Sequence, residues 1–305
     1  MLRRLRISEG RLVDGDENDS PVLIYVAPDE AERRRLVDEM RIDEHTLNSA
    51  LDPDELSRLE FEPDHVAVIF KRPKNYSAKD EFLFRVTSTG VFLFKDRLII
   101  VQPDDGSLYE GKIFSRICSL PNLLLRLIYR SIFHFLEHLK AINMVSTDLE
   151  HRINTAMENR YLLNLFTLEK SLVYYLNGIN SNAKVIDRLQ HNAAKIGLTP
   201  EDLEFLDDIS IENQQCYRQA EIYSNILASM MDARASIVSN NLNIVVKTLT
   251  IITILIMVPT FVVSAFSMNV RMPFETSHPA AFWLIMSLAF LSVTAVIATW
   301  RYKKW

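Results

Sequence analysis

Residues 244–266 read IVVKTLTIITILIMVPTFVVSAF, and this stretch decides the architecture of the chain. It carries a single charge, Lys247, near its start. A second run, residues 280–300, reads AAFWLIMSLAFLSVTAVIATW and has no charge at all. A helix of about 20 residues crosses a hydrocarbon core about 30 Å thick, so each run is long enough to span a membrane. Only residues 267–279 separate the runs, which predicts a hairpin of two transmembrane helices.

The orientation of this hairpin follows from the basic residues at its ends. Three basic residues follow the second run, Arg234 and Lys247 lie at the start of the first, and the connecting loop has only Arg271. Because positive charge collects on the cytoplasmic side, we expect both termini in the cytoplasm. The first ten residues, MLRRLRISEG, have no apolar core behind their basic side chains, so we expect no signal peptide. The sequence thus predicts a multi-pass protein of the inner (plasma) membrane.

Composition narrows the function. The formal net charge of −5 argues against nucleic-acid binding. Cys118 and Cys216 are far apart in the sequence and lack a CxxC partner, so we interpret both as reduced, inert core thiols. None of the seven glycines forms a GxxxxGK phosphate loop, which argues against ATP hydrolysis by this chain.

One short motif suggests an enzyme. Residues 134–138 read HFLEH, which matches the HxxEH pattern of a metallopeptidase class and would place His134 and His138 on one helix face. No third zinc ligand is evident, so we interpret them as two helix-surface histidines. We therefore expect no enzyme, no catalytic residue and no covalent cofactor.

The soluble region divides into two parts. Residues 1–120 predict a cytoplasmic α/β domain, residues 121–240 a long-helix stalk, and residues 241–305 the two-helix transmembrane domain with its short outer loop. Within the α/β domain we predict a strand, two helices and then an antiparallel meander with turns at 88–90 and 95–97. The ranges are 22–27 (strand), 29–40 and 43–51 (helices), and 65–71, 81–87, 90–94 and 97–102 (strands).

The stalk predicts long helices. A break is expected at Asn159-Arg160, and Gly197-Leu198-Thr199-Pro200 predicts a stop and a restart, with Thr199 as N-cap and Pro200 in the first turn. After Pro200 the next proline is Pro259, so the first membrane span is predicted to continue a cytoplasmic helix.

A stripe of small and polar residues follows this helix at alternating steps of four and three residues. Its positions are Asp232, Ser236, Ser239, Asn243, Val246, Thr250, Thr253, Met257, Thr260, Ser264 and Ser267. This is the a/d seam that faces the axis of a parallel bundle. Polar groups at membrane depth are costly unless they meet each other or water, so the stripe suggests a wet pore. Two alternatives remain open: hydroxyls that bond to carbonyls one turn earlier, or close packing of two helices.

A pore would need several subunits, because two helices per chain cannot enclose a channel. Val246 and Met257 of the stripe, with Leu249 beside the first, would then form apolar rings that can gate by dewetting. Plain packing is the alternative for Met257.

The end of the first span carries a recognisable signature. Phe266-Ser267-Met268-Asn269 resembles the Tyr-Gly-Met-Asn signature of the CorA family of divalent-cation channels, and the lead-in from Lys247 to Met257 with Thr260-Phe261 is similar to that family's pore helix. The order of an α/β domain, long helices, a stalk entering the first span, a short outer loop and a basic tail is similar throughout.

This resemblance implies a homopentamer in a lipid bilayer, with the long helix lining the pore. It implies an outer polar ring of Asn269, with Ser267 and Met268 beside it at the ion-selective mouth. It places an inner polar ring at Asn243 and a hydrophobic constriction at Val246, Leu249 and Met257. The transported ion would be Mg²⁺, with Co²⁺, Ni²⁺ or Zn²⁺ as further candidates, and Asp208 and Asp232 would be candidates for regulatory cation sites.

The chain departs from the signature at one position, since Ser267 stands where the family has glycine. Glycine tolerates positive φ, and serine does not do so freely. Two other functions therefore stay open: a non-conducting, membrane-anchored sensor with a CorA-like fold, and a proton-coupled zinc transporter related to the ZntB branch of the family.

Overall fold

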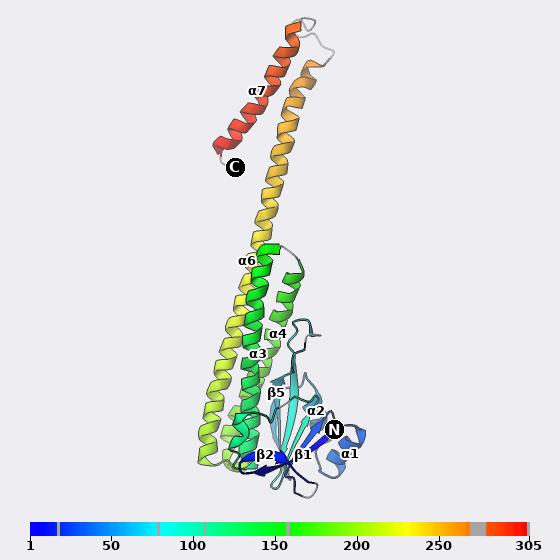
Figure 1. Ribbon diagram of the computed structural model, residues 1–305, viewed down its shortest axis with the longest axis vertical. Coiled ribbons are helices and arrows are strands. Elements are labelled where there is room, and N and C mark those ends of the chain that lie inside the picture. The colour runs from blue at the N-terminus through cyan, green and yellow to red at the C-terminus, as the bar shows by residue number, and fades with distance from the viewer. Residues whose placement is uncertain (17–18, 78–79, 107, 157–158, 269–278, 304–305) are drawn as a thin grey trace. The chain divides into compact units, whose positions relative to one another are not determined.

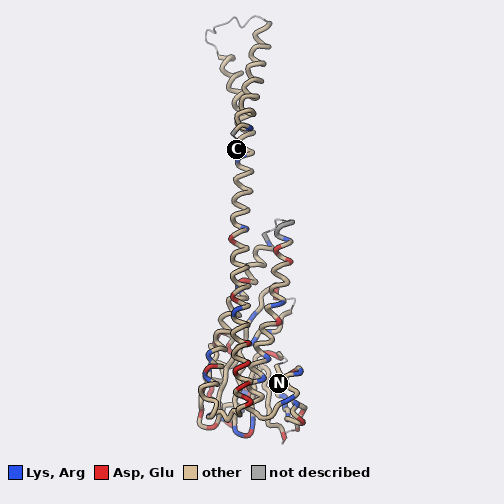
Figure 2. The backbone as a smooth tube through the Cα atoms, turned by 90° about the vertical axis from the view of Figure 1, so that its left-hand side faces the viewer, with Lys and Arg blue, Asp and Glu red and all other residues tan. Residues whose placement is uncertain are grey.

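The structure is a computed structural model that describes residues 1–16, 19–77, 80–106, 108–156, 159–268 and 279–303 (Figure 1). It divides into two compact units, Met1–Met231 and Asp232–Trp305. Charged residues are dense in the first unit and sparse in the second (Figure 2).

The first unit is built on a seven-stranded sheet with strand order β2-β1-β3-β7-β6-β5-β4. Strands β3 and β7 pair in parallel, and the other neighbours pair antiparallel. The strands are β1 (Leu2–Ser8), β2 (Arg11–Asp14), β3 (Val22–Val26), β4 (Arg58–Phe61), β5 (Val66–Pro73), β6 (Val86–Leu93) and β7 (Leu98–Gln102).

Two short helices follow β3 where the sequence predicts them. Helix α1 (Glu30–Asp38) begins after Asp29, whose side chain accepts a bond from the Glu32 amide at 2.8 Å in a capping box. Helix α2 (Glu44–Leu51) begins after Asp43, whose side chain accepts a bond from the Thr46 amide at 2.9 Å. Both helix predictions are confirmed.

The strands of the predicted meander pair antiparallel as expected, but one of the two predicted turns is wrong. Ser88, Thr89 and Gly90 lie inside the single strand β6, because they pair with β5 along the whole ladder. The chain reverses earlier, at Glu81 and Phe82, which both have positive φ. Strands β1, β2 and β4 were not predicted, because β1 and β2 are too polar and β4 too short to show a clear alternation.

The sheet has two covered faces. One carries Tyr25, Ile69, Phe92, Ile99 and Val101, which pack with residues of α1 and α2. The other packs against the long helices, through residues such as Val68, Phe70 and Ile100 on the sheet side.

The long helices are α3 (Leu120–Ala156), α4 (Asn159–His191) and α6 (Pro200–Phe266), with the short helices η2 (Lys112–Ser115) and α5 (Ala193–Ile196) before α3 and α6. Gly197 takes a left-handed conformation at the end of α5. The Thr199 hydroxyl accepts a bond from the Asp202 amide at 3.2 Å and starts α6 as predicted. Helix α6 passes through Pro259 without ending, and α7 (Pro279–Lys303) completes the second unit.

The two cysteines differ. Cys216 is a buried core thiol, and burial raises its pKa to about 12. Cys118 is exposed, so its assignment to the core is wrong. It lies in the irregular segment before α3, and the absence of a CxxC partner says nothing about burial.

Candidate functional site

The second unit contains the membrane-length part of α6 together with α7. By length and composition alone, both helices are long and apolar enough to cross a membrane. The apolar part of α6 has no buried residues in the single chain, and Leu249 and Ile256 are 63% and 62% exposed. A core helix of a soluble protein would bury one face, so this surface requires lipid or further protein chains as its surroundings.

The predicted stripe lies on one exposed side of α6. At 3.6 residues per turn, its members from the second unit fall within about a third of the helix circumference. The exposed residues on this side are Asn243, Val246, Leu249, Thr250, Thr253, Met257, Thr260 and Ser264.

The opposite side of α6 is the more covered one. Ile251, Leu255, Val258 and Val262 are half-buried, and α7 is the helix that runs alongside (Figure 1). An apolar cavity of about 610 Å³ lies between the two helices near Lys247 and Trp300. Val246 and Thr250 border this cavity, so at this level α7 reaches the edge of the stripe. Over the rest of its length the stripe is exposed in the single chain.

The stripe hydroxyls form hydrogen bonds within their own helix. Thr250 donates to the Val246 carbonyl at 2.8 Å, Thr253 to the Leu249 carbonyl at 2.9 Å, and Thr260 to the Ile256 carbonyl at 2.6 Å. The back-bonding alternative is therefore present in the structure, and these threonines need no second helix to satisfy their donors. The hydroxyl proton points into the helix, so each oxygen keeps its accepting lone pairs for what lies outside. A stripe of this kind presents acceptors to its surroundings.

The signature residues lie at the end of α6. The Ser267 amide and hydroxyl both donate to the Ser264 carbonyl, at 3.2 and 2.9 Å, and Met268 is exposed. Positive φ among described non-glycine residues is confined to Glu9, Ala27, Arg41, Glu81 and Phe82. Ser267 therefore fits its backbone without strain. Asn269, the predicted outer ring, lies outside the described residues.

The two candidate regulatory carboxylates belong to different units. Asp208 lies in the first unit and Asp232 at the start of the second, and both are exposed. Among the described residues, no three His, Cys, Asp or Glu side chains are grouped as a metal site would require. Within the described part of one chain, neither carboxylate therefore belongs to a group of three metal-ligating side chains.

The HxxEH histidines are half-buried, which corrects their assignment to the helix surface. Their ring centroids are 4.4 Å apart, and Nδ1 of His138 lies 2.6 Å from the Tyr175 hydroxyl. Burial lowers the pKa of His134 to about 3 and that of His138 to about 4. These are neutral packing residues, and the described part of the chain groups no third ligand with them.

Comparison with known proteins identifies the family. A family model described as "CorA-like Mg2+ transporter protein" matches residues 23–304. The chain belongs to this family. Its members are transporters of divalent cations rather than enzymes.

Individual relatives agree with this membership in sequence and fold. The cobalt/magnesium transport protein CorA of Methanocaldococcus jannaschii is 24% identical over 288 residues, covering 91% of this chain and 89% of that protein. The complete structure of the CorA magnesium transporter from the same organism matches with a TM-score of 0.85 at 22% identity, over 99% of this chain and 97% of that one.

Two further structures share the CorA-like fold at lower identity. Full-length CmaX matches with a TM-score of 0.73 at 14% identity over 100% of this chain and 98% of its own. The ZntB cytoplasmic domain of Vibrio parahaemolyticus matches with a TM-score of 0.59 at 12% identity over 78% of this chain and 98% of its own. These likenesses establish the fold: an α/β domain, long helices and two apolar C-terminal helices.

Proposed function

We propose that this CorA-family chain forms a homopentameric divalent-cation channel in the plasma membrane, with Mg²⁺ as its main ion. The observation that carries this proposal is the acceptor stripe on the exposed side of α6. A stripe of accepting oxygens cannot gain from facing lipid. Five copies around an axis would turn these oxygens toward water and leave α7 on the outside.

The stripe chemistry suits a hydrated cation. Mg²⁺ gives up its water reluctantly and keeps several waters when it binds. The hydrogens of those waters point away from the ion, so they can donate to the Thr250, Thr253 and Thr260 oxygens. Asn243 would add an amide ring at the inner end and Asn269 another at the outer mouth, beside Ser267 and Met268.

Apolar rings would control passage. Val246, Leu249 and Met257 are each at least 60% exposed on the same side of α6. In a pentamer their side chains would narrow the pore and could close it by dewetting without a moving plug.

The basic residues at the ends of the two spans favour cytoplasmic termini. In that orientation the first unit would be exposed to the cations of the cytoplasm. Asp208 and Asp232 would then be candidates for cations shared between neighbouring subunits, since the described residues of one chain group no three metal-ligating side chains.

Reconstitution tests the proposal directly. The full chain, purified in detergent, should have a protein mass of five times 35.2 kDa by native mass spectrometry. In liposomes loaded with a Mg²⁺-sensitive dye it should admit Mg²⁺ down a gradient, whereas protein-free liposomes should not. Absence of flux for Mg²⁺, Co²⁺, Ni²⁺ and Zn²⁺ would favour the membrane-anchored sensor. Zinc uptake that requires an inward proton gradient would favour the proton-coupled transporter.

A further inference from the structure

A second polar site lies in the first unit, beside the part of β5 that extends beyond its pairing with β4. This pairing ends at Ile69, and Asn182 of α4 bonds the backbone of Lys71 beyond it. A pocket of about 360 Å³ opens there, which we call the α4 pocket. Its lining comes from the loop before β4, from β5, from the segment that enters β6, and from α4. These four segments are far apart in the chain, so no local pattern in the sequence predicts the pocket.

Strand pairing and one glycine bring the lining of the α4 pocket together. The register of β5 with β6 places Lys71 and Val86 on one face of the sheet. Gly178 lets α4 come close to them, since a Cβ at this position would lie 3.3 Å from Cγ1 of Val86 and 3.4 Å from Cβ of Lys71. Lys170 and Tyr174 precede Gly178 by two turns and one turn, so they line the pocket from the same side of α4.

Lys71 is the buried cation of the α4 pocket, and it is only 4% exposed. Its Nζ donates to the Pro53 carbonyl at 2.7 Å and to the Ser88 hydroxyl at 2.8 Å. That hydroxyl donates its own proton to the Asp52 carbonyl, so it accepts from Lys71. An ammonium group has three donors, and the described residues supply acceptors for two of them. One donor is therefore left for a ligand.

Positive charge exceeds negative charge in the lining of the α4 pocket. Lys71, Arg85 and Lys170 take part in none of the ion pairs that the described residues form. Asp54 is the one acidic residue among the described lining residues. Three cations and one carboxylate leave an excess of two positive charges.

Nearby acidic groups do not remove this excess. Burial lowers the pKa of Lys71 to about 8, and it outweighs the carboxylates that raise it, those of Asp52, Asp54 and Glu55. The ammonium group therefore remains charged at neutral pH. The charge of Arg85 also acts on Asp80, but this carboxylate lies outside the lining and accepts from a backbone amide and a hydroxyl, both at 2.7 Å.

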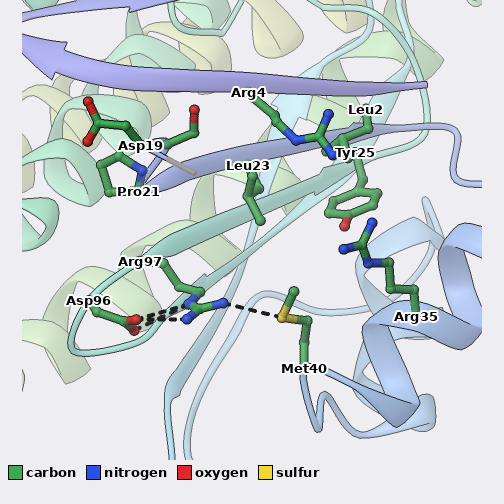
Figure 3. A pocket seen from close by; sticks show the side chains of 11 residues that line it. Leu2, Arg4, Asp19, Pro21, Leu23, Tyr25, Arg35, Met40, Asp96 and Arg97 are labelled. Atoms are coloured by element: carbon green, nitrogen blue, oxygen red, sulfur yellow. Dashed lines mark hydrogen bonds and ion pairs between the residues drawn. The ribbon is translucent and has the colours of Figure 1, made fainter. Parts of the chain in front are cut away.

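A larger pocket of the first unit differs in this respect. It has a volume of about 530 Å³ and lies between β1, β3, α1 and the turn before β7 (Figure 3). There Arg97 binds Asp96 at 2.8 Å, and Arg35 binds Glu39 at 2.9 Å. These carboxylates offset the two guanidinium charges, in contrast to the cations of the α4 pocket.

We propose that the α4 pocket binds a short polyhydroxy phosphomonoester of the size of glycerol 3-phosphate. Its three cations come from three different elements, and a phosphoryl group has three oxygens that accept from three directions. A carboxylate has only two oxygens in one plane. Asp54 would accept a bond from a ligand hydroxyl and would repel a second anionic group. Leu83 and Val86 would contact the carbon backbone of the ligand, and the volume suits a small organic molecule.

Calorimetric titration of the full chain in detergent tests the site, in a buffer free of divalent cations so that the outcome is independent of transport. We expect saturable binding of one glycerol 3-phosphate per chain. Inorganic phosphate lacks the hydroxyl-bearing body, and phosphoenolpyruvate has a carboxylate in its place. Each should bind about tenfold more weakly, because contacts of the ligand body are lost or become repulsive.

Three substitutions test the cations. Arg85→Gln and Lys170→Gln, both at exposed positions, should each weaken binding about tenfold, because each removes a hydrogen bond to a charged group. Lys71→Met should abolish detectable binding, and the two exposed variants decide the outcome if this buried substitution unfolds the chain. The matched control is Lys184→Gln, an exposed lysine outside the pocket and about 21 Å further along α4, which should leave binding unchanged.

Thermal unfolding separates loss of binding from loss of folding. Without ligand, Lys170→Gln and Lys184→Gln should unfold close to the midpoint of the unmodified chain, as exposed substitutions usually do. Glycerol 3-phosphate should raise the midpoint of the unmodified chain and of Lys184→Gln, and raise that of Lys170→Gln less. The proposal is overturned if glycerol 3-phosphate does not bind at millimolar concentration, or if Lys184→Gln weakens binding as much as Lys170→Gln. Binding of inorganic phosphate or phosphoenolpyruvate as tight as that of glycerol 3-phosphate would overturn it as well.

Discussion

Helix α6 follows opposite rules in its two halves. From Pro200 to Met231 one face of the helix is fully buried, as at Leu206, Ile209 and Cys216, while apolar residues off that face, such as Ile211, are exposed. From Asp232 to Phe266 no residue is fully buried, and the regular stripe is polar instead. The first half packs its apolar face into the core of its own unit. The second half exposes apolar side chains on most sides and has most of its hydroxyls on the stripe, with Thr248 off it.

This difference in side-chain pattern indicates the surroundings that suit each half of α6. Water favours a helix with one apolar face turned inward. Lipid favours apolar side chains outside, so the polar row needs an aqueous or protein surface that one chain does not supply. The second half therefore supports the proposed assembly, whereas the first half packs against the core of its own unit.

The largest expected effect comes from removing the Asn269 amide, which is proposed to lie at the outer mouth of the pore. Asn269→Ala should reduce Mg²⁺ flux into liposomes at least about tenfold, because a site that hydrogen-bonds the substrate loses much of its affinity without its polar group. The oligomer should keep its mass, since little packing is lost. The control is Asn240→Ala, which removes the same group from the exposed part of α6 off the stripe. Unchanged Asn269→Ala flux of Mg²⁺, Co²⁺, Ni²⁺ and Zn²⁺ would rule out the pore interpretation.

A matched pair of isoleucines tests the two halves by stability. Ile209 is fully buried and Ile256 is 62% exposed. Ile209→Ala should lower the free energy of unfolding by about 2–5 kcal/mol, because it removes buried carbon and leaves a cavity. Ile256→Ala should cost less than about 1 kcal/mol, as exposed positions usually do. Urea unfolding of the full chain in detergent, followed by circular dichroism, measures both. Equal losses would mean that Ile256 is buried in the assembly as deeply as Ile209 is in its own unit.

Much of this architecture could be predicted from the sequence, because many of its elements depend on residues close together in the chain. The caps at Asp29, Asp43 and Thr199 and the two long apolar runs are local signals, and the structure follows them. Membership of the CorA-like family was likewise readable from the signature and the order of segments.

Contacts between residues far apart in the chain could not be predicted from the sequence. Asn182 of α4 bonds both the amide and the carbonyl of Lys71 in β5, at 2.7 and 2.8 Å, and so completes a strand edge from a helix. Nothing near Asn182 in the sequence announces this role. The same holds for Ser88 and Gly90, which look like a turn but lie inside β6 because β5 pairs with them.

Chemical labelling can test which side of the second half of α6 faces water. In a background without Cys118 and Cys216, single cysteines at Thr253 and Ser264 should react with a small water-soluble thiol reagent. Cysteines at Ile252 and Ile256 should react about tenfold more slowly, because thiolate forms poorly in lipid. Mass spectrometry of the liposome-embedded protein gives the rates. Equal rates at all four positions, or a dimeric mass, would contradict the pentamer and favour the membrane-anchored sensor.

The smallest expected effect is a loss of folding stability of the first unit at acidic pH. Burial lowers the pKa of His134 to about 3, with further contributions from His138, Arg130 and Arg72, and lowers that of His138 to about 4 despite Glu137. In the unfolded chain both titrate near about 6.5. The unfolded state therefore binds more protons below that pH, and stability falls as the pH drops from about 6.5 toward about 4. Since both side chains are half-buried, we expect a loss of only about 1 kcal/mol between pH 7 and pH 5.

The double variant His134→Gln, His138→Gln isolates this contribution. Its thermal midpoint should change less between pH 7 and pH 5 than that of the unmodified chain, while its bound-metal content and Mg²⁺ flux should stay the same. His151→Gln is the control, because this histidine is exposed. An identical pH dependence in the double variant would show that the acid sensitivity arises elsewhere. Loss of one stoichiometric zinc would instead assign the pair to a metal site.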